Sequence, residues 1–311
     1  MEKTGEKEKE PIMELIDFTN CKIDNTYLYR GANGNKIGIE YQGHIYMLKF
    51  PAPLTNNEEM SYSNSCISEY ISCHILESMG FRAQETILGK YFLKNGEEKI
   101  VCACKDFTEE GCFLEEFASL KNSIVDSPNN GYGTDLKEVL DTIQEQNLLP
   151  SEELHNFFWD LFIADAFLGN FDRHNGNWGF LIYRQQKTFA IAPIFDCGSC
   201  LYPQLTDEQM EEYLNNQDEI DKRVYVFPNS ALKINDKKIN YYEYINSLEN
   251  ESCTEALMRV FPKIDLEKIN HIVEETPGIS DVRKRFYQRM LKERYEKILK
   301  VAYDKLFVSR V

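Results

Sequence analysis

The sequence lacks any apolar run of the roughly 20 residues that a membrane-spanning helix requires. Its opening residues, 1–11, are a charged run without the apolar segment of a secretory signal. We therefore expect no membrane partner and a cytoplasmic protein, and we interpret residues 1–15 as a disordered charged tail. Internal repeats and low-complexity tracts are absent as well.

The sequence is also poor in positive charge. It contains 35 Lys and Arg against 51 Asp and Glu, a formal net charge of −16. Such a charge repels the phosphate backbone of nucleic acids, so we expect no nucleic-acid partner. Apolar material is plentiful, because 42% of the 311 residues are hydrophobic and 13% are aromatic. We expect a globular monomer with one large or two modest domains.

Cysteine occurs in an odd number of nine, scattered through the chain, which is typical of reduced thiols in a cytosol. Cys197 and Cys200 have the C-x-x-C spacing of a redox pair or half of a zinc site. A zinc site needs further ligands, and Cys102-Ala-Cys104 has strand alternation instead. We favour buried thiols for Cys197 and Cys200, with a redox or metal role as the alternative.

Hydrophobic periodicity divides the chain near residue 107. The part before this point predicts strands with one helix, and the part after it predicts mainly helices. The expected early strands are 22–29, 36–41, 44–50, 85–92 and 99–105, with a helix at 62–79. The later expected helices are part of 113–122, then 135–146, 151–168, 207–215, 241–248, 253–260, 265–275 and 280–307, with strands at 180–183 and 189–193.

This order predicts an α+β, bilobal, protein-kinase-like fold. Residues 16–107 form an N-terminal antiparallel sheet lobe with one main helix, and residues 108–311 form a mainly helical C-terminal lobe.

Phosphoryl transfer needs a carboxylate for the attacking hydroxyl, oxygen ligands for magnesium and a cation for the phosphates. Asp172 and Asn177 have the separation that kinases use between the catalytic Asp and a metal-binding Asn. They follow a strongly amphipathic helix and precede a short hairpin. Asp196 then ends an apolar strand at Asp196-Cys-Gly198, as the metal-binding Asp of the D-F-G motif does. Each of these three residues alone would also be typical of a turn. All three in this order indicate a site for ATP and Mg²⁺.

The expected nucleotide-binding parts lie upstream. Lys49 ends an apolar strand and is the candidate for pairing with the phosphates, although such a Lys also suits a strand edge. A glycine-containing turn precedes it and offers backbone N–H groups, and a helix after it supplies Glu69, with Glu77 as the alternative partner for Lys49. The nucleotide base would contact backbone groups where the two lobes join. The loop residues are Gly31, Ala32, Asn33, Gly34 and Asn35, and the base-contacting residues are Cys104, Lys105, Asp106 and Phe107.

Read together, these motifs resemble the HipA-like branch of the kinase superfamily, whose loop is N-x-D-R-H-x-x-N. More closely, the chain resembles the compact bacterial CtkA-type protein kinases of this branch. The segments that carry the likeness span nearly the whole chain after the tail: 30–37, 47–51, 59–62, 103–107, 168–180 and 192–203.

The resemblance implies a kinase fold, ATP with Mg²⁺, Ser/Thr phosphorylation of an unidentified protein and frequent autophosphorylation. It implies that Lys49 binds phosphates, that Asp172 is catalytic, and that Asn177 and Asp196 hold metal. His174 of the D-R-H sequence joins the nucleotide-binding set. The CtkA-type resemblance is also compatible with delivery of the protein to a host cell without a signal peptide.

Two differences from HipA proteins limit which of their properties we expect in this chain. HipA toxins carry an extra N-terminal subdomain and bind a DNA-binding antitoxin, whereas only a short charged segment precedes the first expected strand here. The HipA autophosphorylation serine lies in the phosphate loop, but residues 31–38 contain no Ser or Thr, and Tyr29 is the nearest hydroxyl.

Two other functions remain open from the sequence. The D-R-H-x-x-N loop also occurs in phosphoinositide kinases, so a lipid or small-molecule kinase is one alternative. The acidic chain argues against a membrane-facing lipid kinase, although 233–238 is a small basic cluster. An ATP-binding pseudokinase is the other, but Lys49, Glu69, Asp172, Asn177 and Asp196 are all present.

Overall fold

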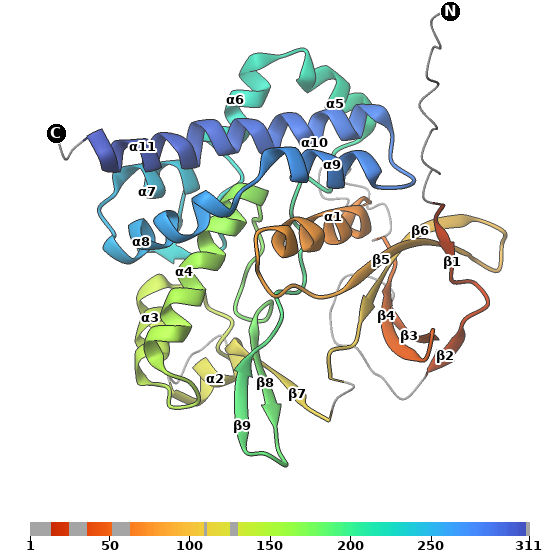
Figure 1. Ribbon diagram of the computed structural model, residues 1–311, viewed down its shortest axis with the longest axis horizontal. Helices are drawn as coiled ribbons and strands as arrows, with labels where there is room; N and C mark the ends of the chain where they lie inside the picture. The colour runs from red at the N-terminus through yellow and green to blue at the C-terminus, as the bar shows by residue number, and fades with distance from the viewer. Residues whose placement is uncertain (1–13, 25–35, 52–62, 109–110, 125–129, 309–311) are drawn as a thin grey trace, which may run out of the picture.

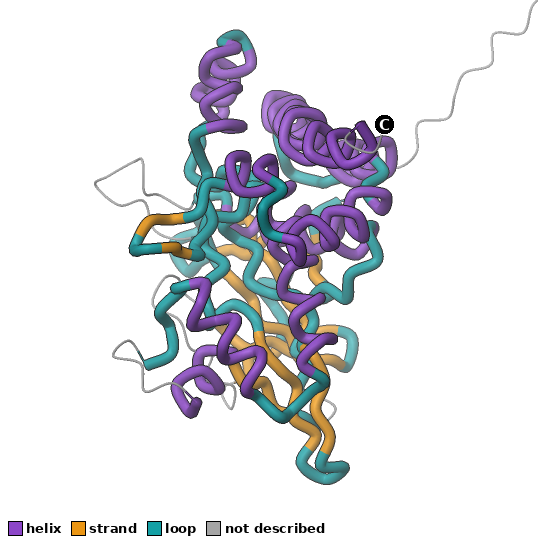
Figure 2. Tube along the Cα trace, turned by 90° about the vertical axis from the view of Figure 1, so that its left-hand side faces the viewer, coloured by secondary structure: helices purple, strands orange, loops and turns teal. Residues whose placement is uncertain are grey.

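A computed structural model describes residues 14–24, 36–51, 63–108, 111–124 and 130–308 of the chain. Figure 1 shows a curled sheet with helix α1 beside it, and a larger helical part next to them. Figure 2 shows from the side that helices run from the top of the molecule down its near face, with most of the strands behind and below them. This is the α+β arrangement that the sequence predicts. We call strands β1–β6 with α1 the sheet lobe and the remainder the helical lobe.

The sheet lobe contains six strands in the order β1-β5-β6-β4-β3-β2. All neighbours pair antiparallel, as expected, except that the short β1 runs parallel to β5 at one edge. The strands are β1 (Ile16–Asp17), β2 (Lys22–Asp24), β3 (Lys36–Tyr41), β4 (His44–Lys49), β5 (Thr86–Phe92) and β6 (Glu98–Lys105).

Strands β3 and β4 form a hairpin whose two central residues, Gln42 and Gly43, both have positive φ angles of 49° and 80°. Such a turn twists in the sense of the strands it joins. Alternation then gives the sheet two distinct faces. On one face, Ile39 and Leu48 are fully buried with Phe18, and on the other Met47 packs against cysteines of β6.

Helix α1 (Ser65–Ser78) covers the second face and contacts β5, β6 and helix α9 of the helical lobe. Gly80, with a φ of 82°, follows its end, which is the predicted stop. The helix buries Glu69 and Cys73 together with apolar residues such as Leu76. A buried carboxylate on this face needs a positive partner.

Ten more α-helices come after α1 in the described residues, and they too bury apolar side chains. α4 lies at the centre of the helical lobe and buries Trp159, Ile163 and Phe167 completely. The helices after α1 are α2 (Phe117–Ile124), α3 (Leu136–Glu145), α4 (Ser151–Leu168), α5 (Asp207–Leu214), α6 (Gln217–Tyr225), α7 (Tyr241–Ser247), α8 (Glu251–Val260), α9 (Leu266–Glu275), α10 (Asp281–Arg294) and α11 (Val301–Val308).

Some local elements were not expected. Strand β7 (Phe113–Glu116) precedes α2 and pairs with β8 (Gly179–Tyr183), far along the sequence, which also pairs with β9 (Thr188–Ile191). Helix α6 was not expected either. The expected helix within 113–122 is confirmed as α2, and the expected helix 280–307 is confirmed as α10 and α11, which a π-helical segment, Tyr295–Lys300, joins.

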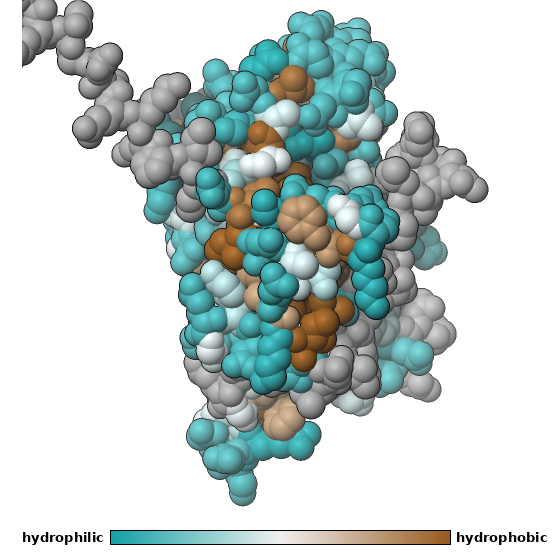
Figure 3. Space-filling view, turned by 90° about the vertical axis from the view of Figure 1, so that its right-hand side faces the viewer, coloured by the Kyte–Doolittle hydropathy of each residue, from teal (hydrophilic) through white to brown (hydrophobic). Residues whose placement is uncertain are grey.

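The small strands β10 (Lys233–Ile234) and β11 (Lys237–Lys238) form a separate hairpin. No helix within the described residues is long and apolar enough to cross a bilayer. Figure 3 shows the face of the sheet lobe, where hydrophilic side chains predominate and apolar ones lie between them.

We predict that Gly179→Ala lowers the free energy of unfolding by about 1–3 kcal/mol. A methyl group on Gly179 would lie 2.1 Å from the carbonyl oxygen of Glu115 on the paired strand, so β7 and β8 would have to move apart. Urea unfolding followed by circular dichroism measures the loss. Gly96→Asn is the control, because Gly96 lies in open space in the left-handed conformation that Asn tolerates. An equal effect of the two substitutions would contradict the prediction.

Candidate active site

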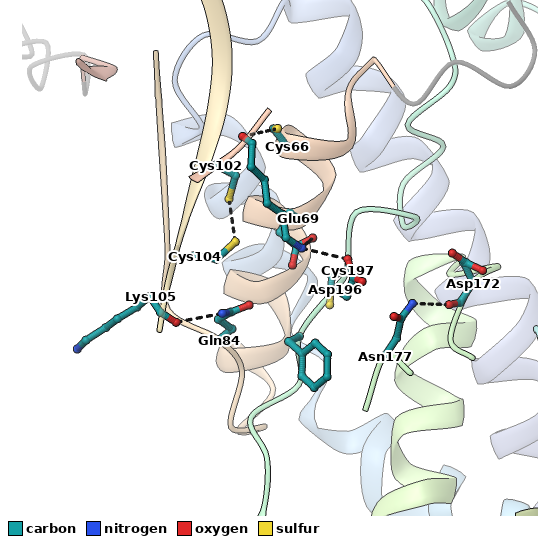
Figure 4. A network of polar contacts seen from close by, with 12 residues as sticks. Cys66, Glu69, Gln84, Cys102, Cys104, Lys105, Asp172, Asn177, Asp196 and Cys197 are labelled. Carbon is teal, nitrogen blue, oxygen red and sulfur yellow. Dashed lines mark hydrogen bonds and ion pairs between the residues drawn. The ribbon is translucent and has the colours of Figure 1, made fainter. Parts of the chain in front are cut away.

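Lys49 lies where the two lobes meet. It ends β4, and its Nζ atom is 2.9 Å from Glu69 Oε2 of α1 and 3.0 Å from Asp196 Oδ1 in the segment after β9. Figure 4 shows Glu69 on α1 and Asp196 on the segment after β9 at this meeting point. The structure therefore brings together a strand Lys, a helix Glu and a loop Asp that are widely separated in sequence.

The opposite charges of this cluster stabilise one another. Burial opposes the charge on Lys49, but Asp196 and Glu69 outweigh it, so the pKa of Lys49 lies well above its usual value. Lys49 in turn holds the pKa of Asp196 at about 2, although the partial burial of this carboxylate opposes the shift. Burial raises the pKa of Glu69, and Lys49 only partly offsets this. The cation is thus held in place by carboxylates of both lobes.

Asp196 has the left-handed backbone conformation, with a φ of 56°. This conformation is uncommon for residues other than glycine, and strained residues of this kind cluster at functional sites. The preceding segment is fixed against the sheet lobe, because Ile194 forms a β-bridge with Ala83 and its carbonyl oxygen accepts from Gln84 N. The geometry aims the Asp196 side chain at Lys49.

The loop after α4 places Asp172 beside Asn177. Asn177 Nδ2 and the backbone N–H of His174 both donate to the Asp172 carbonyl oxygen at 2.8 Å. This bond fixes the Asn177 amide and turns its Oδ1 atom toward the side of Asp196 (Figure 4). The Asp172 carboxylate is partly buried, and desolvation raises its pKa.

A buried ion pair lies beneath this loop. Arg173 donates from Nε and Nη2 to the two carboxylate oxygens of Asp165 at 3.0 and 3.2 Å. Its remaining N–H groups reach the carbonyl oxygens of Asn177 and Phe195 and the Sγ atom of Cys197. All five guanidinium donors are therefore engaged, and one side chain ties α4, the Asp172 loop and the Asp196 segment together.

His174 lies at the edge of the same loop. Its Nδ1 atom accepts from the backbone N–H of Gly176 at 3.0 Å, so Nε2 is the ring nitrogen available to a ligand. The Tyr132 ring meets the His174 ring edge-on at 6.0 Å, and Tyr132 Oη donates to Glu116.

The expected base-contacting residues lie where β6 leaves the sheet. Cys104 is fully buried, and the backbone N–H groups of Lys105 and Asp106 donate to Glu85 O and Ile45 O. The carbonyl of Lys105 accepts from Gln84 Nε2 at 3.0 Å. The contact of residues 104–107 with a base stays a prediction.

The predicted phosphate loop, Gly31 to Asn35, and Tyr29 lie outside the described residues. Cys197 and Cys200 are completely buried free thiols, as we favoured. The part of the chain that the structure describes contains no group of three or more His, Cys, Asp or Glu suited to a metal ion.

The donor set nevertheless fits a divalent cation held mainly by a nucleotide. Asp196 and Asn177 offer oxygen atoms, the ligand type that Mg²⁺ prefers, and Mg²⁺ commonly takes only one or two protein ligands beside phosphates and water. Glu69 Oε1 is buried without a hydrogen-bond partner among the described residues. A buried polar atom of this kind is typical of a site completed by a ligand or water.

Several residues that build the site were not in the predicted set. Asn170 Nδ2 donates to Asp165, its Oδ1 accepts from Asp172 N, and its carbonyl accepts from Tyr241 Oη. Asn175 Nδ2 donates to the carbonyls of Gly131 and Gly133. The signal for Asp165 was a carboxylate on the apolar stripe of α4. No local feature of the sequence identifies the hydrogen-bond partners that lie far along the chain.

Comparison with known proteins gives consistent results. The family model described as the HipA-like C-terminal domain matches residues 22–277. The serine/threonine-protein kinase CtkA of Helicobacter pylori is 49% identical over 283 residues, which cover 91% of this chain and 86% of CtkA.

The structural comparisons agree. The crystal structure of a Helicobacter pylori proinflammatory kinase CtkA matches with a TM-score of 0.87 at 48% identity, covering 94% of this chain and 99% of that chain. A chain of the Shewanella oneidensis HipA, HipB and operator DNA complex matches with a TM-score of 0.57 at 13% identity, covering 89% and 66%. The second likeness shows a shared fold alone.

We predict that Asp165→Asn lowers the free energy of unfolding by about 3–5 kcal/mol, because it leaves the Arg173 charge buried without its counter-charge. Asp160→Asn is a matched control on the same helix, since Asp160 pairs with the partly exposed Arg259. We expect that control to cost about 1 kcal/mol or less. Urea unfolding of both variants measures the difference, and similar losses at the two positions would show that the buried pair has no special role.

Proposed function

The chain belongs to the family of HipA-like C-terminal domains, and on that premise we propose that it is a Ser/Thr protein kinase. It transfers the γ-phosphoryl group of ATP to a hydroxyl group of a protein. The high identity to CtkA over most of both chains supports a protein acceptor rather than a lipid or small molecule.

The observation that carries the proposal is the position of Lys49 between Glu69 and Asp196. Active kinases require both the Lys–Glu pair and a correctly placed metal-binding Asp. Here Lys49 contacts both carboxylates within 3.0 Å. A pseudokinase that had lost turnover would not need this arrangement to be intact, so it argues for catalysis.

Asp172 is proposed to orient the acceptor hydroxyl and to accept its proton. Its partial burial and raised pKa make the carboxylate a stronger proton acceptor than an exposed Asp. The hydrogen bonds from His174 and Asn177 to its backbone carbonyl hold it in place. This rigidity matters because the protein contributes mainly positioning and electrostatics to phosphoryl transfer.

The remaining roles follow from position. ATP, when bound, supplies the phosphoryl group, and a divalent metal neutralises its charge. Asn177 through Oδ1 and Asp196 would hold that metal, which we propose is Mg²⁺. Lys49 would bind the phosphates, and His174 would donate to them from Nε2. The backbone of residues 104–107 would contact the base, and residues 31–35 would cover the phosphates.

We also propose that the protein phosphorylates itself. Intact-mass and peptide mass spectrometry after incubation with ATP and Mg²⁺ reports both the modified residue and its type.

We predict that Asp172→Asn lowers the transfer rate at least 100-fold, because it removes the proton acceptor. ADP affinity should stay within about threefold, because Asp172 is not assigned to the nucleotide. Labelled ATP, protein extract and phosphoinositide vesicles provide the acceptors, and Asp160→Asn is the control. Label confined to the lipid fraction, or no label from the parent protein, would overturn the proposed function.

Asp196→Asn should raise the Mg²⁺ concentration for half-maximal activity at least tenfold, because a carboxylate ligand becomes a neutral amide. ADP affinity measured in EDTA should not fall, since the substitution removes negative charge near the phosphates. An equal loss of nucleotide binding with and without metal would mean that Asp196 supports the nucleotide site rather than the metal.

A further inference from the structure

The hairpin of β10 and β11 is a basic element in an acidic chain. Residues 233–238 contain three lysines and one aspartate, whereas the whole chain has a formal net charge of −16. The two turn residues, Asn235 and Asp236, both have positive φ angles, of 50° and 63°. A two-residue turn of this kind matches the twist of the strands that it joins. The hairpin therefore holds its lysines in a defined register.

Hydrogen bonds attach the first strand of this hairpin to the loop that carries Asp172. The backbone N–H of Lys233 donates to the carbonyl oxygen of Thr134 at 2.8 Å. The preceding residue, Gly133, accepts from Asn175 Nδ2 of the loop at 2.7 Å. The β10 strand and the Asp172 loop are therefore bound to the same short segment.

The second strand is attached to the same loop from its other end. Tyr241 Oη donates to the carbonyl oxygen of Asn170 at 2.7 Å, and Asn170 Oδ1 accepts from the backbone N–H of Asp172 at 3.0 Å. Lys238 precedes Tyr241 by three residues, a stretch that spans at most about 11 Å. These contacts place the lysine-bearing end of the hairpin beside Asp172.

The register of the hairpin separates its lysines into two faces. Lys233 lies opposite Lys238, and Ile234 lies opposite Lys237. Directly opposite residues project from the same face, and neighbours along a strand project from opposite faces. Lys233 and Lys238 therefore share one face, and Lys237 lies on the other. Burial raises the pKa of Asp172, and the charge of Lys238 is among those that oppose this rise, which agrees with the first face being turned toward Asp172.

The lysine pair has no counter-charge of its own. Within the described part of the chain, the side chains of Lys233 and Lys238 form neither an ion pair nor a hydrogen bond. Like charges at directly opposite positions destabilise a hairpin unless an anion lies close to both. An acidic side chain that arrives next to the acceptor hydroxyl would supply that anion.

We propose that Lys233 and Lys238 form a substrate-recognition site that selects protein acceptors with an Asp or Glu close to the phosphorylated Ser or Thr. The inference rests on the proposed function, because it assumes that Asp172 binds the acceptor hydroxyl. The two ammonium groups bind the acidic side chain while Asp172 holds the hydroxyl. They also offset, at this one place, the repulsion that an acidic chain exerts on an acidic substrate.

The test compares Lys238→Glu with Lys237→Glu. The two lysines are adjacent and exposed, and both substitutions change the charge equally, but only Lys238 lies on the face of the pair. Each purified full-length protein is incubated with ATP, Mg²⁺ and a protein extract whose own kinases have been inactivated by heat. Mass spectrometry of phosphopeptides locates the modified residues, and thermal unfolding shows whether each variant is folded.

The measured quantity is the frequency of Asp and Glu within three residues of the modified Ser and Thr, relative to all Ser and Thr of the extract. We expect an enrichment of at least about twofold for the parent, within the range of one exposed ion pair. Lys238→Glu should remove the enrichment, because a repulsive charge replaces an attractive one, and Lys237→Glu should keep it. Because the quantity is a ratio, a general change in the rate of transfer does not affect it.

A parent without enrichment overturns the inference, and so does a Lys238→Glu variant that loses no more of it than Lys237→Glu. Lys238→Met is the second variant should Lys238→Glu fail to fold, and it should lower the enrichment toward the background. A folded Lys238→Met variant that modifies no protein at all also overturns the inference, because Lys238 would then support transfer in general.

The two proposals fail in distinguishable ways. A parent that modifies proteins without regard to acidic neighbours overturns the substrate-recognition site and leaves the kinase assignment in place. A parent that modifies no protein overturns the kinase assignment and, with it, the recognition site.

Discussion

The buried Arg173 side chain is the interaction on which the active site depends. Its five donors are shared between a carboxylate of α4, a carbonyl of the Asp172 loop and the segment that carries Asp196. A guanidinium in the interior is tolerated only when its charge and its N–H groups are fully matched. The matching therefore fixes the relative positions of the proposed catalytic and metal-binding residues.

The Lys49 cluster adds the sheet lobe to this frame. Asp196 takes part in both, because its own segment is bound by Arg173 and its side chain contacts Lys49. A shift of Asp196 would therefore alter the position of Lys49 and, with it, the contact of Lys49 with Glu69 on α1. Such coupling explains why the proposed phosphate, metal and hydroxyl sites can be organised before a nucleotide arrives.

Much of the fold could be predicted because its local signals agree with its tertiary structure. The alternation around the Gln42-Gly43 turn, the stop of α1 at Gly80 and the apolar surface of α4 each specify their element without outside help. The strand Phe113–Glu116 was not predicted because its partner lies in Gly179–Tyr183, and a short segment cannot reveal such pairing. The limits of the two lobes at residues 107 and 108 stay a prediction.

The sequence by itself determined the class of chemistry. Asp172, Asn177 and Asp196 occur at kinase spacing, and the D-R-H loop indicates the HipA-like branch, because such motifs are local in the chain. Only the tertiary structure decided which residues meet. The contacts of Lys49 with Glu69 and Asp196 and the Asp165–Arg173 pair join residues from different elements. Packing and charge compensation, rather than sequence spacing, select these partners.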